Sequence, residues 1–292
     1  MVKPNIFLVG VQKAGTTSLY HYLRKHSDIF GPEIKDYNNS HPFFTNEEYF
    51  QNNKADFEKL FSDNSTILNV ITSEVEFIED IEYLKRIKKY SPNAKIVVSL
   101  RNPIERLKSM YKFYNQIGSN PEGLNFEDAL TQKSELYIQR SLYYNKIMNL
   151  YKVFDSNQIK IVYFEDITGN KFNSVIEELY KFIGVPYEDS PFIHENKTRL
   201  VKYSFVDRIM KFGRETRVRK FIVHNLLDNF FDANKRYRLK KKIREWNLSD
   251  QKLSSKSKEQ MSVPSYVSEM LINDTKQLSQ LINKDLITFW GL

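Results

Sequence analysis

The 292-residue sequence contains no cysteine. Disulfide bonds, thiolate metal sites and cysteine nucleophiles are therefore excluded, and a reducing compartment fits the composition. No run of about 18 apolar residues occurs, so no transmembrane helix is expected. The first apolar stretch, Ile6–Val9, is too short for the hydrophobic region of a signal peptide, and we expect a cytoplasmic protein.

Histidine is also scarce, and the few histidines do not fall at spacings typical of metal ligands. The sequence therefore predicts a site that needs no metal. The five histidines are His21, His26, His41, His194 and His224.

Positive charge is concentrated in one part of the chain. The net charge is +8, yet the segment 197–258 carries 19 Lys and Arg against 6 Asp and Glu. Such a segment suits an anionic ligand, a nucleic acid or a membrane surface, or forms the solvated face of helices. Within it, Lys235–Lys242 interleaves tyrosine and leucine with basic residues, which leaves open a non-catalytic nucleic-acid binder as an alternative function. We favour the solvated face and expect no nucleic-acid partner.

Short apolar runs alternate with segments of helical periodicity. An amphipathic helix is expected over Leu19–His26, and Leu107, Met110, Tyr111 and Tyr114 form another helical stripe. Strands that alternate with helices predict an α/β fold with a P-loop-like central parallel sheet. The expected strands are Ile6–Val9, Ile67–Ile71, Ile96–Leu100 and Ile159–Phe164.

The C-terminal part of the chain follows a different pattern. From about residue 201 onward the periodicity becomes helical throughout, with the basic segment inside it. We therefore predict one domain over residues 1–292, with an α/β core at about 1–200 and a helical, basic region at about 201–292.

A glycine-containing turn follows the first expected strand. Gly10 and Gly15 flank Lys13, and three hydroxyl residues come next, before the first helix. Such a turn directs backbone N–H groups and a helix N-terminus at one point, which creates an anion site. The candidate anion-binding residues are Gln12, Lys13, Ala14, Gly15, Thr16, Thr17 and Ser18.

This turn differs from the Walker A loop, G-x-x-x-x-G-K-[ST]. Lys13 comes two residues before Gly15, and the residue directly before Thr16 is Gly15 rather than a lysine. In a Walker A loop, the hydroxyl that holds Mg²⁺ directly follows the lysine. Here Thr16 follows Gly15, so this Mg²⁺-binding arrangement is missing. A Mg²⁺-dependent nucleotide kinase or NTPase remains an alternative, but the position of the lysine disfavours it.

A second anion site is expected where the strand Ile96–Leu100 ends. Arg101 follows this strand, Asn102 is a suitable N-cap, and Pro103 suits the first helical position. Open α/β sheets bind ligands at the carboxyl ends of their strands. Arg101 and the hydroxyl of Ser109 are therefore candidates for binding a terminal phosphate.

Together, the two motifs resemble those of sulfotransferases that use 3′-phosphoadenosine 5′-phosphosulfate (PAPS), especially the heparan-sulfate-type and bacterial branch. The resemblance implies that the segment Gln12–Ser18 binds the 5′-phosphosulfate and that Arg101 and Ser109 hold the 3′-phosphate. It also extends to the loop Lys197, Thr198 and Arg199, which would close over the nucleotide, and to a final helix over Leu278–Trp290. The implied reaction is an in-line, metal-independent transfer that releases adenosine 3′,5′-bisphosphate (PAP).

The acceptor side departs from the family pattern. The segment around Lys35, Asp36 and His41 resembles a Lys-Glu…Phe-Phe signature whose Glu often acts as the general base. Here Asp36 replaces that Glu and lies farther from Phe43-Phe44 than usual, so Asp36 and His41 are both candidate bases, and Asp36 is favoured. Lys35 is a candidate contact to the sulfonate.

A further departure falls in the segment Ile71–Phe77, which usually helps to shape the acceptor pocket. It retains little of the Gly-Glu…Ser-Pro…Tyr pattern of the family. We expect a small-molecule natural product as the acceptor, with a glycan as the next choice, and transfer to a hydroxyl or an amine.

Overall fold

The computed structural model describes residues 3–32, 42–61, 67, 69–117, 123–188, 200–201, 248–249 and 261–292. The chain divides into two compact units. One comprises residues 1–110, 133–196 and 263–292, and the other comprises residues 111–132 and 197–262. The single domain expected over residues 1–292 stays a prediction.

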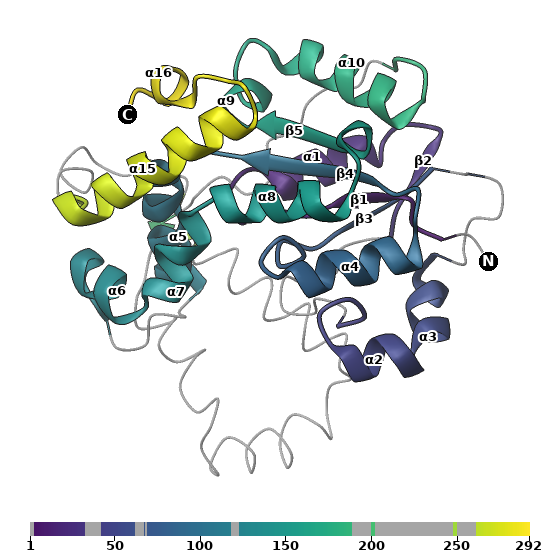
Figure 1. Ribbon diagram of the computed structural model, residues 1–292, viewed down its shortest axis with the longest axis horizontal. Helices are drawn as coiled ribbons and strands as arrows, with labels where there is room; N and C mark the ends of the chain where they lie inside the picture. Colours follow the sequence, from purple (N-terminus) through teal and green to yellow (C-terminus); the bar gives the residue numbers. More distant parts are fainter. Residues whose placement is uncertain are drawn as a thin grey trace. The chain divides into compact units, whose positions relative to one another are not determined.

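A five-stranded sheet forms the centre of the first unit (Figure 1). All four strand pairs are parallel, and the strand order is β2-β3-β1-β4-β5. The predicted α/β fold with a central parallel sheet is therefore confirmed. The strands are β1 (Ile6–Leu8), β2 (Ile29–Phe30), β3 (Asn69–Ser73), β4 (Lys95–Leu100) and β5 (Ile159–Tyr163).

Helices cover both faces of this sheet, as Figure 1 shows. The described helices of the two units together are α1 (Thr16–Leu23), α2 (Glu47–Asn52), α3 (Lys54–Glu58), α4 (Ile81–Tyr90), α5 (Pro103–Ile117), α6 (Phe126–Gln132), α7 (Ser134–Tyr137), α8 (Tyr144–Val153), α9 (Phe164–Ile167), α10 (Phe172–Ile183), α15 (Ser265–Leu281) and α16 (Leu286–Trp290), of which α6 and the last turns of α5 belong to the second unit. Three short 3₁₀ turns lie at Lys59–Phe61, Gln139–Ser141 and Ser156–Gln158.

Alternate residues of β1 belong to two separate hydrophobic cores. Ile6 and Leu8 pack on one face with residues of α1 and α10, and Phe7 lies on the other with residues of α4 and α8. Both faces of the strand are thus buried, which explains why its sequence is a continuous apolar run rather than an alternating one. The four predicted strands agree with β1, β3, β4 and β5 to within two residues, and the two-residue strand β2 was not expected.

Helix ends follow ordinary capping chemistry. Asn102 accepts backbone hydrogen bonds from Ile104 and Glu105, which confirms it as the N-cap of α5. Gly184 ends α10 with φ of 88°, a left-handed conformation that glycine adopts at little cost. The first helix, expected over Leu19–His26, begins three residues earlier, directly after Gly15.

Two expectations for the C-terminal part were wrong in detail. Leu200–Val201 (β6) pairs antiparallel with Leu248–Ser249 (β7), so the region after residue 201 is not all-helical. The single helix expected over Leu278–Trp290 is instead the end of α15, a turn, and α16. The chain reverses at Asn283, whose φ is 51°.

In the second unit, Tyr111 packs edge-on against Phe126 of α6, with 5.2 Å between ring centroids, and its hydroxyl donates to the Leu124 carbonyl. Among the described helices of either unit, none is both long and apolar enough to cross a membrane.

Candidate active site

The loop between β1 and α1 is held in place by the neighbouring strand β4. The Val11 N–H donates to the Ser99 carbonyl at 2.8 Å, and the Ser99 N–H donates to the Gly10 carbonyl at the same distance. The Ser99 hydroxyl, fully buried, donates to the Ala14 carbonyl at 2.6 Å. These bonds continue the ladder between the strands past the end of β1, so β4 fixes the path of the loop backbone.

Glycine is required where the loop enters α1. Gly15 is the N-cap of the helix and has φ of 79°. A Cβ atom at this position would lie 3.0 Å from the Phe164 ring and 3.1 Å from Ile167, both on α9. The absence of a side chain therefore lets α9 pack against the loop, and the loop leads directly into the N-terminus of α1, the end of a helix that suits an anion.

Arg101 places its guanidinium beside the same loop. Its Nη1 donates to the Lys13 carbonyl at 3.1 Å, and its guanidinium carbon lies 4.2 Å from the centroid of the Phe164 ring. Burial lowers the pKa of Arg101, and the carboxylates of Glu105 and Glu165 act against this effect. Its buried Nε has no hydrogen-bond partner among the described residues. A buried, unsatisfied cationic donor at the carboxyl end of a central strand is the chemistry expected of a phosphate contact.

Burial and positive neighbours also act on Lys13. Burial, together with the positive charges of Arg101 and Arg106, lowers its pKa to about 8. The backbone of Lys13 has φ of 73°, unusual for a residue with a side chain. Three cations, Lys13, Arg101 and Arg106, thus lie close enough to influence one another at this loop, and an anionic ligand would be attracted to them.

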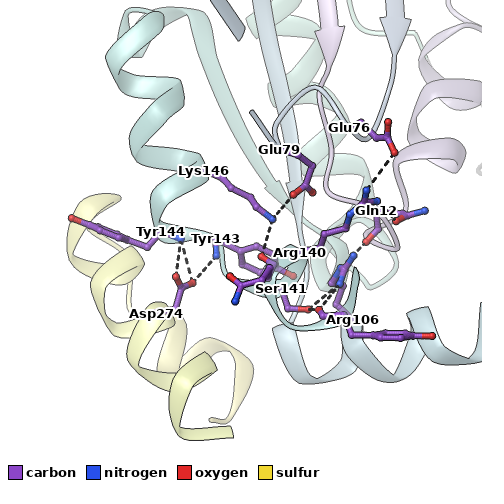
Figure 2. A network of polar contacts seen from close by, with 12 residues as sticks. Gln12, Glu76, Glu79, Arg106, Arg140, Ser141, Tyr143, Tyr144, Lys146 and Asp274 are labelled. Carbon is purple, nitrogen blue, oxygen red and sulfur yellow. Dashed lines mark hydrogen bonds and ion pairs between the residues drawn. The ribbon is translucent and has the colours of Figure 1, made fainter. Parts of the chain in front are cut away.

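Arg106 was not expected to take part. This residue of α5 is fully buried, and its Nε donates to the Gln12 carbonyl at 3.1 Å. Its Nη1 donates to the Tyr137 carbonyl at 3.0 Å and to the Ser141 hydroxyl at 2.9 Å (Figure 2). One signal could have revealed it: Arg106 shares the helical spacing of Pro103 and Met110, which are also buried. A cation in an apolar stripe must find buried acceptors, and here the phosphate loop supplies one.

A third arginine, Arg140, contacts the loop through the Gln12 side chain. The Arg140 Nη1 donates to the Gln12 Oε1 at 3.2 Å, and its Nη2 lies 3.4 Å from the Glu76 Oε1 (Figure 2). Close by, the Lys146 Nζ pairs with the Glu79 Oε2 at 2.7 Å. These ion pairs connect the loop to the segment after β3 and to the region around α8.

The C-terminal helices α15 and α16 contact the start of α8 and the α9 residue Glu165, which in turn contacts the backbone next to Arg101. Asp274 of α15 accepts hydrogen bonds from the backbone N–H groups of Tyr143 and Tyr144 at the start of α8 (Figure 2). The buried Tyr143 hydroxyl donates to the Arg101 carbonyl at 3.0 Å. In addition, Glu165 accepts from the Trp290 indole N–H at 3.1 Å and from the Asn102 N–H at 3.0 Å. Residues near the end of the sequence therefore hold the backbone that carries Arg101.

The structure brings one predicted group together and leaves others untested. The segment 12–18 and Arg101 lie side by side, as the contact between Arg101 and Lys13 shows. Ser109 lies partly buried on α5, and its role stays a prediction. The candidates Lys35, Asp36, His41, Lys197, Thr198 and Arg199 lie outside the described residues, as does the basic cluster 235–242. Within the described part of the chain, no three His, Asp or Glu side chains are placed to hold a metal ion.

Comparison with known proteins gives a consistent assignment. The family model described as "Sulfotransferase domain" matches residues 3–258. The membrane-associated sulfotransferase kil1 of Dictyostelium discoideum is 26% identical over 182 residues, which cover 59% of this chain and 37% of that protein. The bifunctional heparan sulfate N-deacetylase/N-sulfotransferase 1 of Xenopus tropicalis is 28% identical over 203 residues, covering 62% and 22%. The alignments thus span well under half of these relatives' own length.

A solved structure extends the likeness to the whole chain. The sulfotransferase from Alicyclobacillus acidocaldarius matches with a TM-score of 0.64 and 19% identity, covering 100% of both chains. At this identity the match speaks for the fold alone, and the fold is the one described above. The family model, which matches most of the sequence, decides the assignment: the chain belongs to the sulfotransferase family.

Proposed function

We propose that the chain transfers a sulfuryl group from PAPS to a hydroxyl or an amine of its acceptor and releases PAP. The observation that carries the proposal is the contact between the two anion sites: Arg101 Nη1 lies 3.1 Å from the Lys13 carbonyl. A donor with phosphate groups at both the 3′ and 5′ positions needs two such sites close together. Arg101 and Ser109 would hold the 3′-phosphate, and the segment 12–18 would hold the 5′-phosphosulfate.

The residues of the loop suit sulfuryl transfer. In such a reaction negative charge shifts to the bridging oxygen of the leaving group, so catalysis depends mainly on positioning and electrostatics. Lys13 would stabilise that oxygen as a charged donor. An ammonium whose pKa is lowered to about 8 can also share a proton with the departing phosphate.

Two further arginines would keep the loop in its binding conformation. Arg106 holds the Gln12 carbonyl, and Arg140 holds the Gln12 side chain. Neither contact uses a backbone N–H group of the loop. The loop would therefore bind an anion without first having to change its path, which reduces the conformational entropy that binding costs.

The proposed acceptor rests on the name of one relative and on the location expected from the sequence. We infer a small-molecule natural product as the first choice and a glycan as the second, because one relative is named for heparan sulfate N-sulfotransfer. The expected cytoplasmic location favours the small molecule. Lys35, with Asp36 or His41, remains a candidate for the acceptor side, and Lys197, Thr198 and Arg199 remain candidates for closing over the nucleotide.

Thermal unfolding with PAP, set beside ADP plus Mg²⁺, tests the donor. A ligand that binds only the native state at 100 times its dissociation constant adds about 2.7 kcal/mol, which corresponds to a shift of several degrees. We expect PAP to stabilise the wild-type chain without metal and to have little effect on the Arg101→Ala variant. Stabilisation by ADP plus Mg²⁺ alone would support a nucleotide kinase instead.

A further inference from the structure

The segment that follows β3 lies directly against the start of the phosphate loop. The Glu74 N–H donates to the Leu8 carbonyl at 3.2 Å, and the Ile78 N–H donates to the Val9 carbonyl at 3.2 Å. A Cβ atom at Gly10 would lie 2.9 Å from Ile78 Cγ2 and 3.1 Å from the Val75 carbonyl oxygen. The turn 74–78 is therefore anchored on β1, and Glu74 is its first residue.

Strand order places Glu74 on the side of the loop opposite Arg101. β1 lies between β3 and β4, so the carboxyl ends of these strands present Glu74, the phosphate loop and Arg101 in that sequence along the edge of the sheet. If Arg101 holds the nucleotide, the leaving group lies toward β4. In-line transfer requires the acceptor to approach the sulfur from the opposite side, which is the side where β3 ends.

The surroundings of Glu74 suit a group that accepts a proton near neutral pH. Its side chain is partly buried. Burial and, to a lesser extent, the neighbouring carboxylate of Glu76 raise its pKa to about 7, against the opposing effect of the N–H groups of Glu76 and Val75 and the charge of Arg140. Glu76 is paired with Arg140, at 3.4 Å. The carboxyl group of Glu74 is thus coupled to the pair that holds Gln12, and among the described contacts it has no cation of its own.

We propose, given sulfuryl transfer from PAPS, that Glu74 is the general base of the reaction. Its carboxylate accepts the proton of the acceptor hydroxyl or amine while the acceptor oxygen or nitrogen forms a bond to sulfur. At the same time the bond between sulfur and the bridging oxygen breaks, and its electron pair goes to the 5′-phosphate of PAP beside Lys13. The products are the sulfated acceptor, PAP and a protonated Glu74, which returns its proton to water.

The test compares Glu74→Gln with the wild-type chain. The amide keeps the size of the side chain but cannot accept the proton, so the rate of PAP release from PAPS should fall on the order of 10²- to 10⁴-fold. Release would be measured with 2-naphthol, tyramine, glucosamine and 4-nitrophenol as acceptors, and with water alone. The loss should be smallest with 4-nitrophenol, which ionises near neutral pH without help. A merely structural defect would lower all these rates equally.

The pH profile supplies a second readout. The wild-type rate should rise with pH through about 7 as Glu74 loses its proton, and this rise should be absent from Glu74→Gln. Glu76→Gln removes a negative neighbour and leaves Arg140 with less of its counter-charge, so the rise should move to lower pH. Glu82→Gln, an exposed position on α4, is the matched control and should leave the profile unchanged.

PAP affinity separates this proposal from the proposed function. Glu74→Gln should bind PAP within about twofold of the wild type, because the residue does not contact the donor side in this account. A Glu74→Gln chain that retains the wild-type rate and pH profile would overturn Glu74 as the base. If the wild-type chain does not bind PAP, or binds it and releases none from PAPS with any of these acceptors or water, the proposed function itself fails.

Discussion

Lys13 should destabilise the ligand-free protein while it serves the reaction. Burial and two nearby arginines lower its pKa from 10.5 to about 8, so holding it charged at pH 7 costs free energy. At 1.36 kcal/mol per pKa unit the cost is about 3 kcal/mol, which solvent screening of the partly exposed side chain reduces to roughly 2 kcal/mol. Lys13→Met removes the charge and keeps a side chain of similar length. Because lysine and methionine both carry a Cβ, the backbone strain at φ of 73° is the same in both chains.

We therefore expect Lys13→Met to unfold at a higher temperature than the wild-type chain, by about 4 °C at pH 7. The sign follows from proton linkage. Because the pKa of Lys13 is lower in the folded state, the cost is fully present below pH 8 and disappears as the pH rises from about 8 to 10.5. The advantage of the variant should fade over that same interval.

Scanning calorimetry at pH 7 and pH 9.5 provides the measurement, and Lys25→Met provides the control. Lys25 is exposed, so its replacement should change stability by less than about 0.5 kcal/mol. In Lys13→Met, the rate of transfer from PAPS should also fall on the order of 10²- to 10³-fold, because a donor at the developing anion is lost. A Lys13→Met chain as stable as, or less stable than, the wild type at pH 7 would refute the reasoning.

Two further outcomes follow from the same loop. Gly15→Ala should lower the free energy of unfolding by about 2–4 kcal/mol, because alanine is strained at a positive φ and its Cβ would press on Phe164. Gly291 has a similar φ of 65° but open space around it, so Gly291→Ala should lose less stability and isolates the cost of the backbone angle. Both losses would be measured by denaturant titration. If both lose equally, the packing argument is wrong. PAP binding should be strongest below pH 8 and weaken above it, because the bisphosphate raises the pKa of Lys13 and binding must then take up a proton. Titration calorimetry at pH 8.5 in buffers of different ionisation enthalpy should detect that uptake in the wild type and not in Lys13→Met.

Local signals explain why parts of the site could be predicted from the sequence. The phosphate loop consists of consecutive residues, so a buried strand, two glycines and a lysine are visible together. Arg101 follows a strand and precedes a capped helix, and the residues that predict both elements lie within a few positions of it. The resemblance to sulfotransferases rests on these two segments, and the family assignment agrees with it.

Contacts between distant segments explain what could not be predicted. Arg106 and Arg140 both support Gln12, yet they lie 94 and 128 residues away from it in the chain. Their roles depend on packing that no local pattern encodes. Likewise, β2 has only two residues, too few for a periodic signal, and the contact between Trp290 and Glu165 joins α16 to α9, across 125 residues of sequence.

The base illustrates the same limit. The sequence draws attention to Asp36 and His41 because they resemble a known signature. Glu74 becomes a candidate only when the strand order shows which side of the loop the acceptor must approach. Its burial and the pairing of Glu76 with Arg140 are equally invisible in the sequence.

The most direct test of the account compares the affinities of PAP and 5′-AMP for the wild-type chain and for Arg101→Ala, by titration calorimetry at pH 7. The two ligands differ only in the 3′-phosphate, the group assigned to Arg101. The wild type should bind PAP more tightly than 5′-AMP, and Arg101→Ala should weaken PAP binding by about 10- to 100-fold, as expected for a charged hydrogen bond, while 5′-AMP binding changes little. Equal binding of the two nucleotides by the wild-type chain, or an equal loss for both in the variant, would contradict the donor site proposed here.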